Sequence, residues 1–198
     1  MTKPKDVEVE IRGKLSKRQF SQILSILRSR AKFLNQYKRL SADLSPGFDP
    51  KSCSWKFDEQ IDLRVKKSGD SERISLKIGN VNAKRRQEIE VKLKKGEFLN
   101  SISLFSNLGF NKGMLYFWES WEFEYKGCEV KLSKYTNSYY TWEIESKGYA
   151  DPSKLANEMN LRAYSDSEYS EAVAWENKNI HKPFSLELTE KLLKKNIK

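Results

Sequence analysis

Two carboxylates and a guanidinium alternate with apolar side chains near the start of the chain, in Glu8-Val9-Glu10-Ile11-Arg12. Successive side chains of a β-strand point to opposite faces, so a strand here would place Glu8, Glu10 and Arg12 on one face. Carboxylates at this spacing can hold a hard divalent cation, and the guanidinium can bind an anion that the cation also contacts. The alternative is an amphipathic strand whose charged face meets water, as in many antiparallel sheets.

The same alternation returns at Glu88-Ile89-Glu90-Val91-Lys92. In both places a Leu, a short basic stretch and a Phe follow, in Leu15 to Phe20 and in Leu93 to Phe98. This recurrence favours chemistry over a merely solvated face. It also predicts two half-chain repeats, each with a charged strand followed by a helix.

Composition limits the class of protein. The 198 residues suffice for one domain or two small ones, and 12% aromatic residues argue against disorder despite 32% charged residues. The formal net charge of +10 predicts an anionic partner, such as phosphates, nucleic acid or a membrane surface. Because no apolar run approaches the roughly 20 residues that span a bilayer, and no signal peptide is evident, we expect a soluble, cytoplasmic protein without a membrane partner.

The two cysteines offer little chemistry. Cys53 and Cys128 lie far apart, and the lone His181 lies in a Lys/Pro context. A zinc site or a Cys-His nucleophile is therefore not expected, and unpaired thiols suit a reducing compartment.

Capping signals and hydrophobic periodicity predict the helices. Ser16 resembles an N-cap with Gln19 three residues on, and Phe20 begins an apolar face at helical spacing. Asp151-Pro152 is a similar start. The expected helices run from Ser16 to beyond Leu27, about 96–108, about 151–159, 167–175 and 184–193.

About eight strands are expected, most of them charged on one face. The segment 45–54, with two prolines and a glycine, is expected to be a loop. The expected strands cover residues 7–12, 33–44, 61–66, 74–78, 86–91, 114–125, 129–133 and 140–145.

Two arrangements of these strands are open. One is an open sheet with a wet face. The other is an α+β fold with a closed or nearly closed eight-stranded antiparallel β-barrel, whose charged face lines the interior and whose helices pack outside. We expect a single domain over 1–198, with the barrel at about 6–146 and C-terminal helices at about 151–198.

A barrel interior of this kind would need to enclose a charged ligand, because buried charges require partners. The cations suit a polyanion, and the carboxylates would repel it unless a divalent metal lay between them. A triphosphate with Mg²⁺ or Mn²⁺ satisfies both requirements. The cations of the expected charged face are Arg12, Arg64, Lys66, Lys77, Arg86, Lys92 and Lys131; the carboxylates are Glu8, Glu10, Glu88, Glu143 and Glu145.

Several segments in order resemble the CYTH superfamily, the triphosphate tunnel metalloenzymes. The first strand is similar to the hallmark Glu-x-Glu-x-Lys of that family, and the resemblance covers roughly residues 6–146. The other matching segments are Leu63-Arg64-Val65-Lys66, Ile74 to Lys77, Arg86-Gln87-Glu88, Trp142 to Glu145, and Ser167 to Tyr169.

The resemblance implies an eight-stranded tunnel that binds a triphosphate with a metal and usually hydrolyses it. By position, Glu8, Glu10, Glu143 and Glu145 would hold the metal, while Glu88 would orient basic groups or bind a second metal. The phosphate ligands would be Arg12, Arg64, Lys66, Lys77 and Arg86.

The sequence also departs from the family pattern. Arg12 replaces the hallmark lysine, and a residue that could deprotonate is lost. Tyr116-Phe117-Trp118 stands where the family has Lys-x-Arg, Ser133 replaces an Asp, and Tyr139 replaces a Gly. These changes predict either an altered substrate, with an organic group stacked on Tyr116 or Trp118, or a tunnel that binds without turnover.

The working hypothesis is a metal-dependent phosphohydrolase acting on tripolyphosphate, thiamine triphosphate or a nucleoside triphosphate. One alternative is a catalytically degenerate tunnel that binds polyphosphate, nucleotide or an RNA 5′ triphosphate end. Another is a basic sheet that binds single-stranded RNA by stacking bases on Trp118, Trp121 and Tyr139. An adenylyl cyclase is least favoured, because nothing in the sequence specifies adenine recognition.

Overall fold

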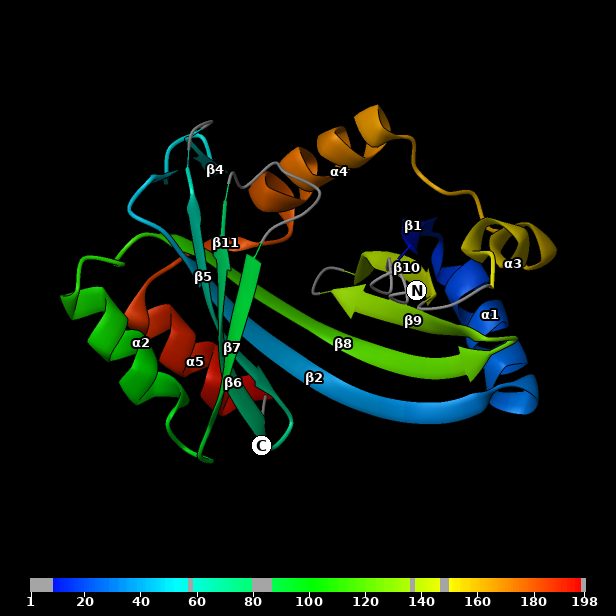
Figure 1. Ribbon diagram of the computed structural model, residues 1–198, viewed down its shortest axis with the longest axis horizontal. Coiled ribbons are helices and arrows are strands. Elements are labelled where there is room, and N and C mark those ends of the chain that lie inside the picture. Colours follow the sequence, from blue (N-terminus) through cyan, green and yellow to red (C-terminus); the bar gives the residue numbers. More distant parts are fainter. Residues whose placement is uncertain (1–8, 57–58, 80–86, 136–137, 147–149, 197–198) are drawn as a thin grey trace, which may run out of the picture. The chain divides into compact units, whose positions relative to one another are not determined.

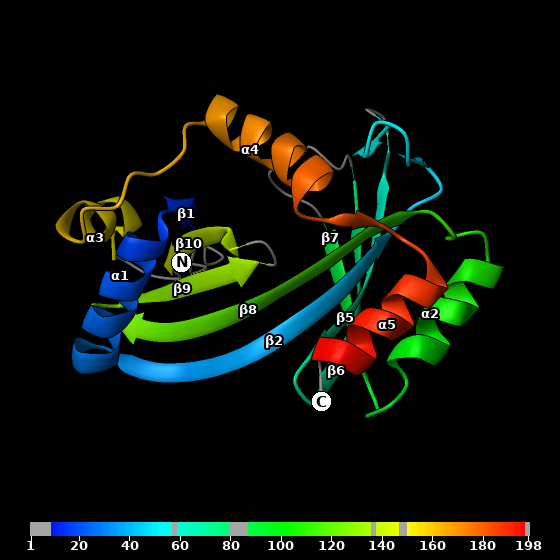
Figure 2. The same ribbon diagram turned by 180° about the vertical axis from the view of Figure 1, so that it is seen from behind.

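The computed structural model of the chain describes residues 9–56, 59–79, 87–135, 138–146 and 150–196 (Figures 1 and 2). In this part the chain is α+β, with five helices and a large antiparallel sheet. The hydrogen-bonded strand order is β1-β10-β9-β8-β2-β5-β6-β7, with β11 added to β8. Because that order ends at β1 and at β7 among the described residues, hydrogen bonds do not close the sheet. The closed barrel therefore stays a prediction.

The chain divides into two compact units. Unit 1 comprises residues 1–37 and 119–172, and unit 2 comprises residues 38–118 and 173–198. Three elements contribute residues to both units: β2 (Lys32–Leu44), β8 (Gly113–Tyr125) and α4 (Asp166–Asn179). The expectation of one domain over 1–198 stays a prediction.

Unit 1 has one sheet face covered by helices. Its own strands are β1 (Val9–Leu15), β9 (Cys128–Tyr135) and β10 (Tyr140–Ser146), and β10 pairs antiparallel with both others. The helices α1 (Lys17–Arg30) and α3 (Pro152–Glu158) pack against the apolar face (Figure 1). The other face carries the charges. The buried core residues of unit 1 are Leu15, Phe20, Ile23, Leu27, Trp121, Phe123, Cys128, Val130, Leu132, Tyr140, Trp142, Ile144, Leu155, Ala156 and Leu161.

The start of α1 confirms the predicted capping box. The Gln19 backbone N–H donates to the Ser16 hydroxyl at 3.2 Å, and the Ser16 backbone N–H donates to the Gln19 side chain at 2.9 Å. Phe20, Ile23 and Leu27 are buried, as their helical spacing predicts. Asp151 likewise caps α3.

Unit 2 repeats the arrangement. Its own strands include β5 (Ile61–Ser68), β6 (Ser71–Ile78) and β7 (Gln87–Leu93), paired antiparallel in that order. The helices α2 (Phe98–Asn107) and α5 (Leu186–Asn196) lie side by side over its apolar core (Figure 2). The expected strands 61–66 and 74–78 lie within β5 and β6, which form a hairpin with its turn at Gly69-Asp70. The short strand β11 (Lys182–Pro183) pairs antiparallel with β8.

The segment 45–54 differs from its predicted loop. It contains a short antiparallel pair, β3 (Phe48–Asp49) with β4 (Ser54–Trp55). The rings of Phe48 and Trp55 meet edge to face with centroids 5.1 Å apart. This contact joins the two strands, and the Asp49 side chain accepts hydrogen bonds from the turn between them. Pattern reasoning missed the pair because each strand has only two residues.

None of the described helices is both long enough and apolar enough to cross a membrane.

Candidate functional site

Three carboxylates form a row across the charged face of unit 1. The register places Glu10 of β1 opposite Glu145 of β10, and Glu145 opposite Glu129 of β9. Directly opposed residues of an antiparallel pair share a face, with Cβ atoms about 4.5–5.5 Å apart. Three acidic side chains therefore occupy neighbouring positions on three strands. We refer to Glu10, Glu145 and Glu129 as the carboxylate row.

The next row on the same face contains two cations. Arg12 lies opposite Glu143, and Glu143 lies opposite Lys131. The Lys131 Nζ atom lies 3.2 Å from Glu143 Oε2, and Arg12 Nη1 lies 3.9 Å from Glu143 Oε1. Arg12 Nη2 also contacts Glu10 Oε1 at 2.5 Å, which links this cationic row to the carboxylate row.

The surroundings keep both cations charged. Burial by itself would lower the pKa of Arg12, but Glu143, Tyr169 and Glu10 outweigh it and raise the pKa. Burial likewise opposes the charge of Lys131, and Glu143 raises the pKa of that amine above its ordinary value. Unit 1 therefore presents two charged cations, paired through Glu143, beside the three carboxylates of the carboxylate row.

The carboxylate row matches the oxygen donors that Mg²⁺ and Mn²⁺ prefer. As the side chains lie, however, no group of three or more His, Cys, Asp or Glu residues in the described part of the chain is arranged to hold a metal ion. Glu10 instead pairs with Arg12. A metal ion bound by the carboxylate row would replace the ion pair between Glu10 and Arg12. The case for a metal ion here therefore depends on the type of the donor atoms and on the strand register. Glu8, the other expected ligand of the first strand, lies outside the described residues.

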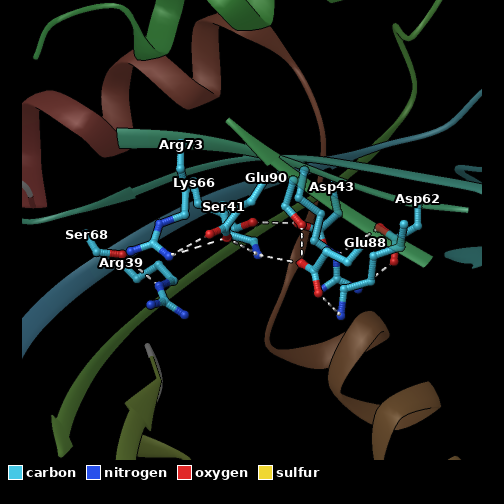
Figure 3. Close-up of polar contacts among 12 residues, drawn as sticks. Arg39, Ser41, Asp43, Asp62, Lys66, Ser68, Arg73, Glu88 and Glu90 are labelled. Carbon is cyan, nitrogen blue, oxygen red and sulfur yellow. Dashed lines mark hydrogen bonds and ion pairs between the residues drawn. The ribbon is translucent and has the colours of Figure 1, made fainter. Parts of the chain in front are cut away.

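In unit 2, the expected phosphate ligand Arg64 forms ion pairs with two carboxylates. Its Nε and Nη2 atoms donate to the two oxygens of Asp62 at 2.9 and 2.7 Å, and Nε lies 3.2 Å from Asp43 Oδ2. Asp43 and Asp62 are nearly inaccessible, at 6% and 5% exposure. Figure 3 shows these two acids on neighbouring strands. One guanidinium thus holds two buried carboxylates.

Burial dominates the electrostatics of this ion-pair cluster. It raises the pKa of Asp43, although Arg64 opposes the shift. Burial lowers the pKa of Lys66, and the nearby charge of Arg64 adds to that effect. The pKa of Arg64 is raised, because Asp43 and Asp62 outweigh the cost of its burial.

Lys66 and Lys77, the other described phosphate candidates of unit 2, both approach Glu88. The Lys77 Nζ atom lies 3.6 Å from Glu88 Oε2, and Lys66 Nζ lies 4.0 Å from Glu88 Oε1. The Ser75 hydroxyl donates to Glu88 at 2.5 Å. Glu88 therefore contacts two basic groups, and its expected roles stay predictions. Arg86 lies outside the described residues.

The aromatic departures have different environments. Tyr116 is packed, with its ring 4.1 Å from that of His181 and its hydroxyl 3.3 Å from Asn177 Oδ1. Trp118 is half-buried, and the Arg39 guanidinium lies 5.3 Å from its ring centroid. Of the three rings in the RNA hypothesis, Trp121 and Tyr139 are buried, at 7% and 6% exposure, and offer no face to a base.

Ser133, which stands where the family has an Asp, is buried and lies 3.0 Å from the hydroxyl of Ser120. The two serines form a hydrogen bond, and no carboxylate stands at this position.

The sequence analysis did not predict three acids that the structure places in these charged clusters. Glu129 alternates with Lys131 and could have been flagged, but its position beside Glu145 depends on the strand pairing. Asp62 shares a strand face with Arg64, and the spacing of two residues was a usable signal. Asp43 lies on a neighbouring strand and had no local signal.

Comparison with solved structures identifies the fold. A protein from Pyrococcus horikoshii is 17% identical, with a TM-score of 0.58, and the match covers 82% of this chain and 93% of that one. A candidate adenylate cyclase from Vibrio parahaemolyticus is 11% identical, with a TM-score of 0.51, over 95% of this chain and 99% of that one. The chain thus shares its fold with these proteins.

A third similar structure is a Hippeastrum protein, described as a candidate adenylyl cyclase with a dominant triphosphatase activity. It is 15% identical, with a TM-score of 0.50, and the match covers 91% of this chain and 99% of that one. No protein-family model matches the sequence, and no curated protein is significantly similar to it. At these identities the likeness is one of fold.

Proposed function

We propose that this protein is a triphosphatase of the CYTH type, which binds a triphosphate together with a divalent cation and hydrolyses a phosphoanhydride bond. The observation that carries the proposal is the arrangement on unit 1, where the carboxylate row lies directly beside the row of Arg12, Glu143 and Lys131. Donors for a hard cation and cations for phosphate oxygens thus occupy one sheet face.

In unit 1 the acidic residues would bind the metal ion and the basic residues would bind the phosphate groups. Glu10, Glu145 and Glu129 would hold Mg²⁺ or Mn²⁺, and the bound ion would neutralise phosphate charge and polarise a water molecule. Arg12 and Lys131 would bind phosphate oxygens and stabilise charge that develops during phosphoryl transfer. Neither cation serves as a base, because each is held protonated by its carboxylate neighbours.

The shared fold supports this proposal, and the charged residues of unit 1 carry it. The Hippeastrum structure is described as having a dominant triphosphatase activity, and structures described as candidate adenylate cyclases share the fold as well. Membership of the CYTH superfamily and a cytoplasmic location belong to the same proposal, as do the phosphate-binding roles of Arg64, Lys66, Lys77 and Arg86.

The test is phosphate release from tripolyphosphate, thiamine triphosphate and ATP, with Mg²⁺ or Mn²⁺ and with excess chelator. We expect metal-dependent release from at least one substrate. Glu10→Gln and Glu145→Gln should reduce kcat at least about 100-fold, because each removes a charged donor from the ion. Glu190→Gln is the matched control, because Glu190 is an exposed carboxylate on α5. Release that persists unchanged in both row variants would overturn the proposal.

A second candidate is a protein that binds a triphosphate without turnover. It is favoured by two observations: Arg12 replaces a lysine that could deprotonate, and Arg64 is already held by two carboxylates. It predicts metal-dependent thermal stabilisation by tripolyphosphate with no phosphate released. Release at a rate that Glu145→Gln abolishes would exclude it.

A further inference from the structure

The last strand of the unit 2 sheet presents an edge to other chains. β7 (Gln87–Leu93) pairs with β6, and in the part of the chain that the structure describes it pairs with no further strand. All of its residues except Leu93 are exposed. The outward N–H and C=O groups of such an edge strand form a template on which another strand can pair.

An exposed apolar strip accompanies this edge. Ile61 of β5 lies opposite Ile78 of β6. Ile89 and Val91 of β7 share that face, because they pair with the β6 residues two and four positions before Ile78. The exposure of these four side chains runs from 37% for Ile61 to 51% for Val91. Adjacent exposed apolar side chains of this kind are typical of an interaction surface.

The charges on β7 favour a second β7 strand as the partner. If two β7 strands paired antiparallel about a two-fold axis at Val91, Glu90 of each copy would lie opposite Lys92 of the other. Val91 would lie opposite Val91, and Ile89 opposite Leu93. Directly opposed residues share a sheet face, so each acid would meet a base and each apolar side chain an apolar one.

Neighbouring registers of the same two strands are less favourable. An axis at Ile89 would set Glu88 opposite Glu90, and an axis at Glu90 or Lys92 would set that residue opposite its own copy. An axis between two residues would set charged side chains opposite apolar ones. Charged residues on an edge strand usually prevent pairing with other chains. On β7 they disfavour these registers and are compatible with the one centred on Val91.

Both charged residues of this register are accessible to a second copy. Within the described residues, Lys92 makes no hydrogen bond and no ion pair. Glu90 lies 3.2 Å from Arg73 Nη1 and is 43% exposed, so its carboxylate can accept from a further cation (Figure 3). We propose that β7 pairs with β7 of a second copy of this chain about a two-fold axis at Val91, which makes the protein a symmetric dimer. This dimer does not depend on the proposed triphosphatase activity.

Sedimentation equilibrium of the full chain measures the association. We expect a dimer at micromolar to millimolar concentrations. Lys92→Glu and Glu90→Lys should each weaken it at least about tenfold, because each sets two like-charge pairs across the interface. An equimolar mixture of these two variants should associate again, because every charged pair of the mixed dimer then joins an acid and a base. Lys195→Glu at an exposed position on α5 changes the net charge as Lys92→Glu does and should leave the association within about twofold of wild type.

Amide hydrogen exchange of the wild-type protein locates the contact. Exchange over residues 87–93 should slow as the protein concentration rises, because the outward amides of β7 gain partners. A protein that stays monomeric, as closure of the sheet within one chain would leave it, would overturn the proposal. So would a dimer whose β7 amides exchange at an unchanged rate, or equal losses in Lys92→Glu and Lys195→Glu. Failure of the two folded variants to associate when mixed would do the same. None of these measurements depends on whether the protein hydrolyses triphosphate.

Discussion

The Arg12 guanidinium lies against the ring of Tyr169, 4.5 Å from the ring centroid. Arg12 belongs to β1 and Tyr169 to α4, more than 150 positions later in the chain. The Tyr164 backbone N–H also donates to the Arg12 carbonyl at 2.9 Å, so the segment before α4 lies against β1. The C-terminal part of unit 1 thereby positions Arg12, which links the carboxylate row to Glu143 and Lys131.

Tyr169→Ala should weaken triphosphate binding by about 2- to 5-fold, the value of a partly exposed cation–π contact. Tyr169→Phe keeps the ring and should stay close to wild type. If Tyr169 positions Arg12, the loss appears in KM or Kd, and Tyr169→Ala in an Arg12→Ala background adds little further loss. Additive losses in the double variant would show that Tyr169 acts independently of Arg12.

Arg64→Ala should lower the unfolding free energy much more than Arg12→Ala. Removing Arg64 leaves the buried Asp43 and Asp62 without their guanidinium, which should cost about 3–5 kcal/mol of unfolding free energy. Arg12 is 38% exposed, so its removal should cost less than about 1 kcal/mol while impairing triphosphate binding. Urea denaturation of both variants measures the difference. Similar unfolding free energies would contradict the structural role of Arg64.

Glu72 makes stability depend on pH. Its buried carboxylate accepts hydrogen bonds from the backbone N–H groups of Gly96 and Phe98, at the start of α2, and from Lys67 Nζ. Burial opposes ionisation, but the Lys67 and backbone hydrogen bonds outweigh it and lower the pKa of Glu72. The stabilisation is therefore present above the unfolded pKa of about 4.3 and is lost as pH falls through the lower folded pKa.

Glu72→Gln should reduce the unfolding free energy at pH 7 by about 1–3 kcal/mol, because the charged acceptor is removed. It should also remove part of the stability loss between about pH 5 and pH 3. Thermal melts across that range check both effects, with Glu187→Gln on the exposed start of α5 as the control. A parallel pH dependence in wild type and Glu72→Gln would exclude Glu72 as its source.

Gly13 allows a close approach at the end of β1. A Cβ atom at this position would lie 2.4 Å from the Arg162 carbonyl oxygen and 2.7 Å from Trp142 Nε1. Gly13→Ala should therefore cost about 1–3 kcal/mol of unfolding free energy through overpacking. Because the segment from Arg162 leads to Tyr169, we also expect weaker triphosphate binding. Wild-type stability in Gly13→Ala would show that the Arg162 segment moves freely.

Local pattern determined most of the secondary structure. Periodicity of two predicted the charged strands, periodicity of 3.6 predicted α1, and Ser16 and Asp151 marked helix starts that the structure confirms. The apolar faces under helices also followed from periodicity, because a side chain's face depends only on its place within its own strand or helix. These properties are local, and the sequence carries them directly.

Strand pairing determined which charges meet. Glu129 joins Glu10 and Glu145 only because β9 pairs with β10, and Asp43 reaches Arg64 only because β2 pairs with β5. The turn of a hairpin sets its register locally, but β9 and β10 meet β1, and β2 meets β5, through contacts between residues far apart in sequence, which no turn specifies. The sequence by itself determined that acids and bases share strand faces. The tertiary structure alone decided that Asp43 reaches Arg64 and that Arg12 lies against Tyr169.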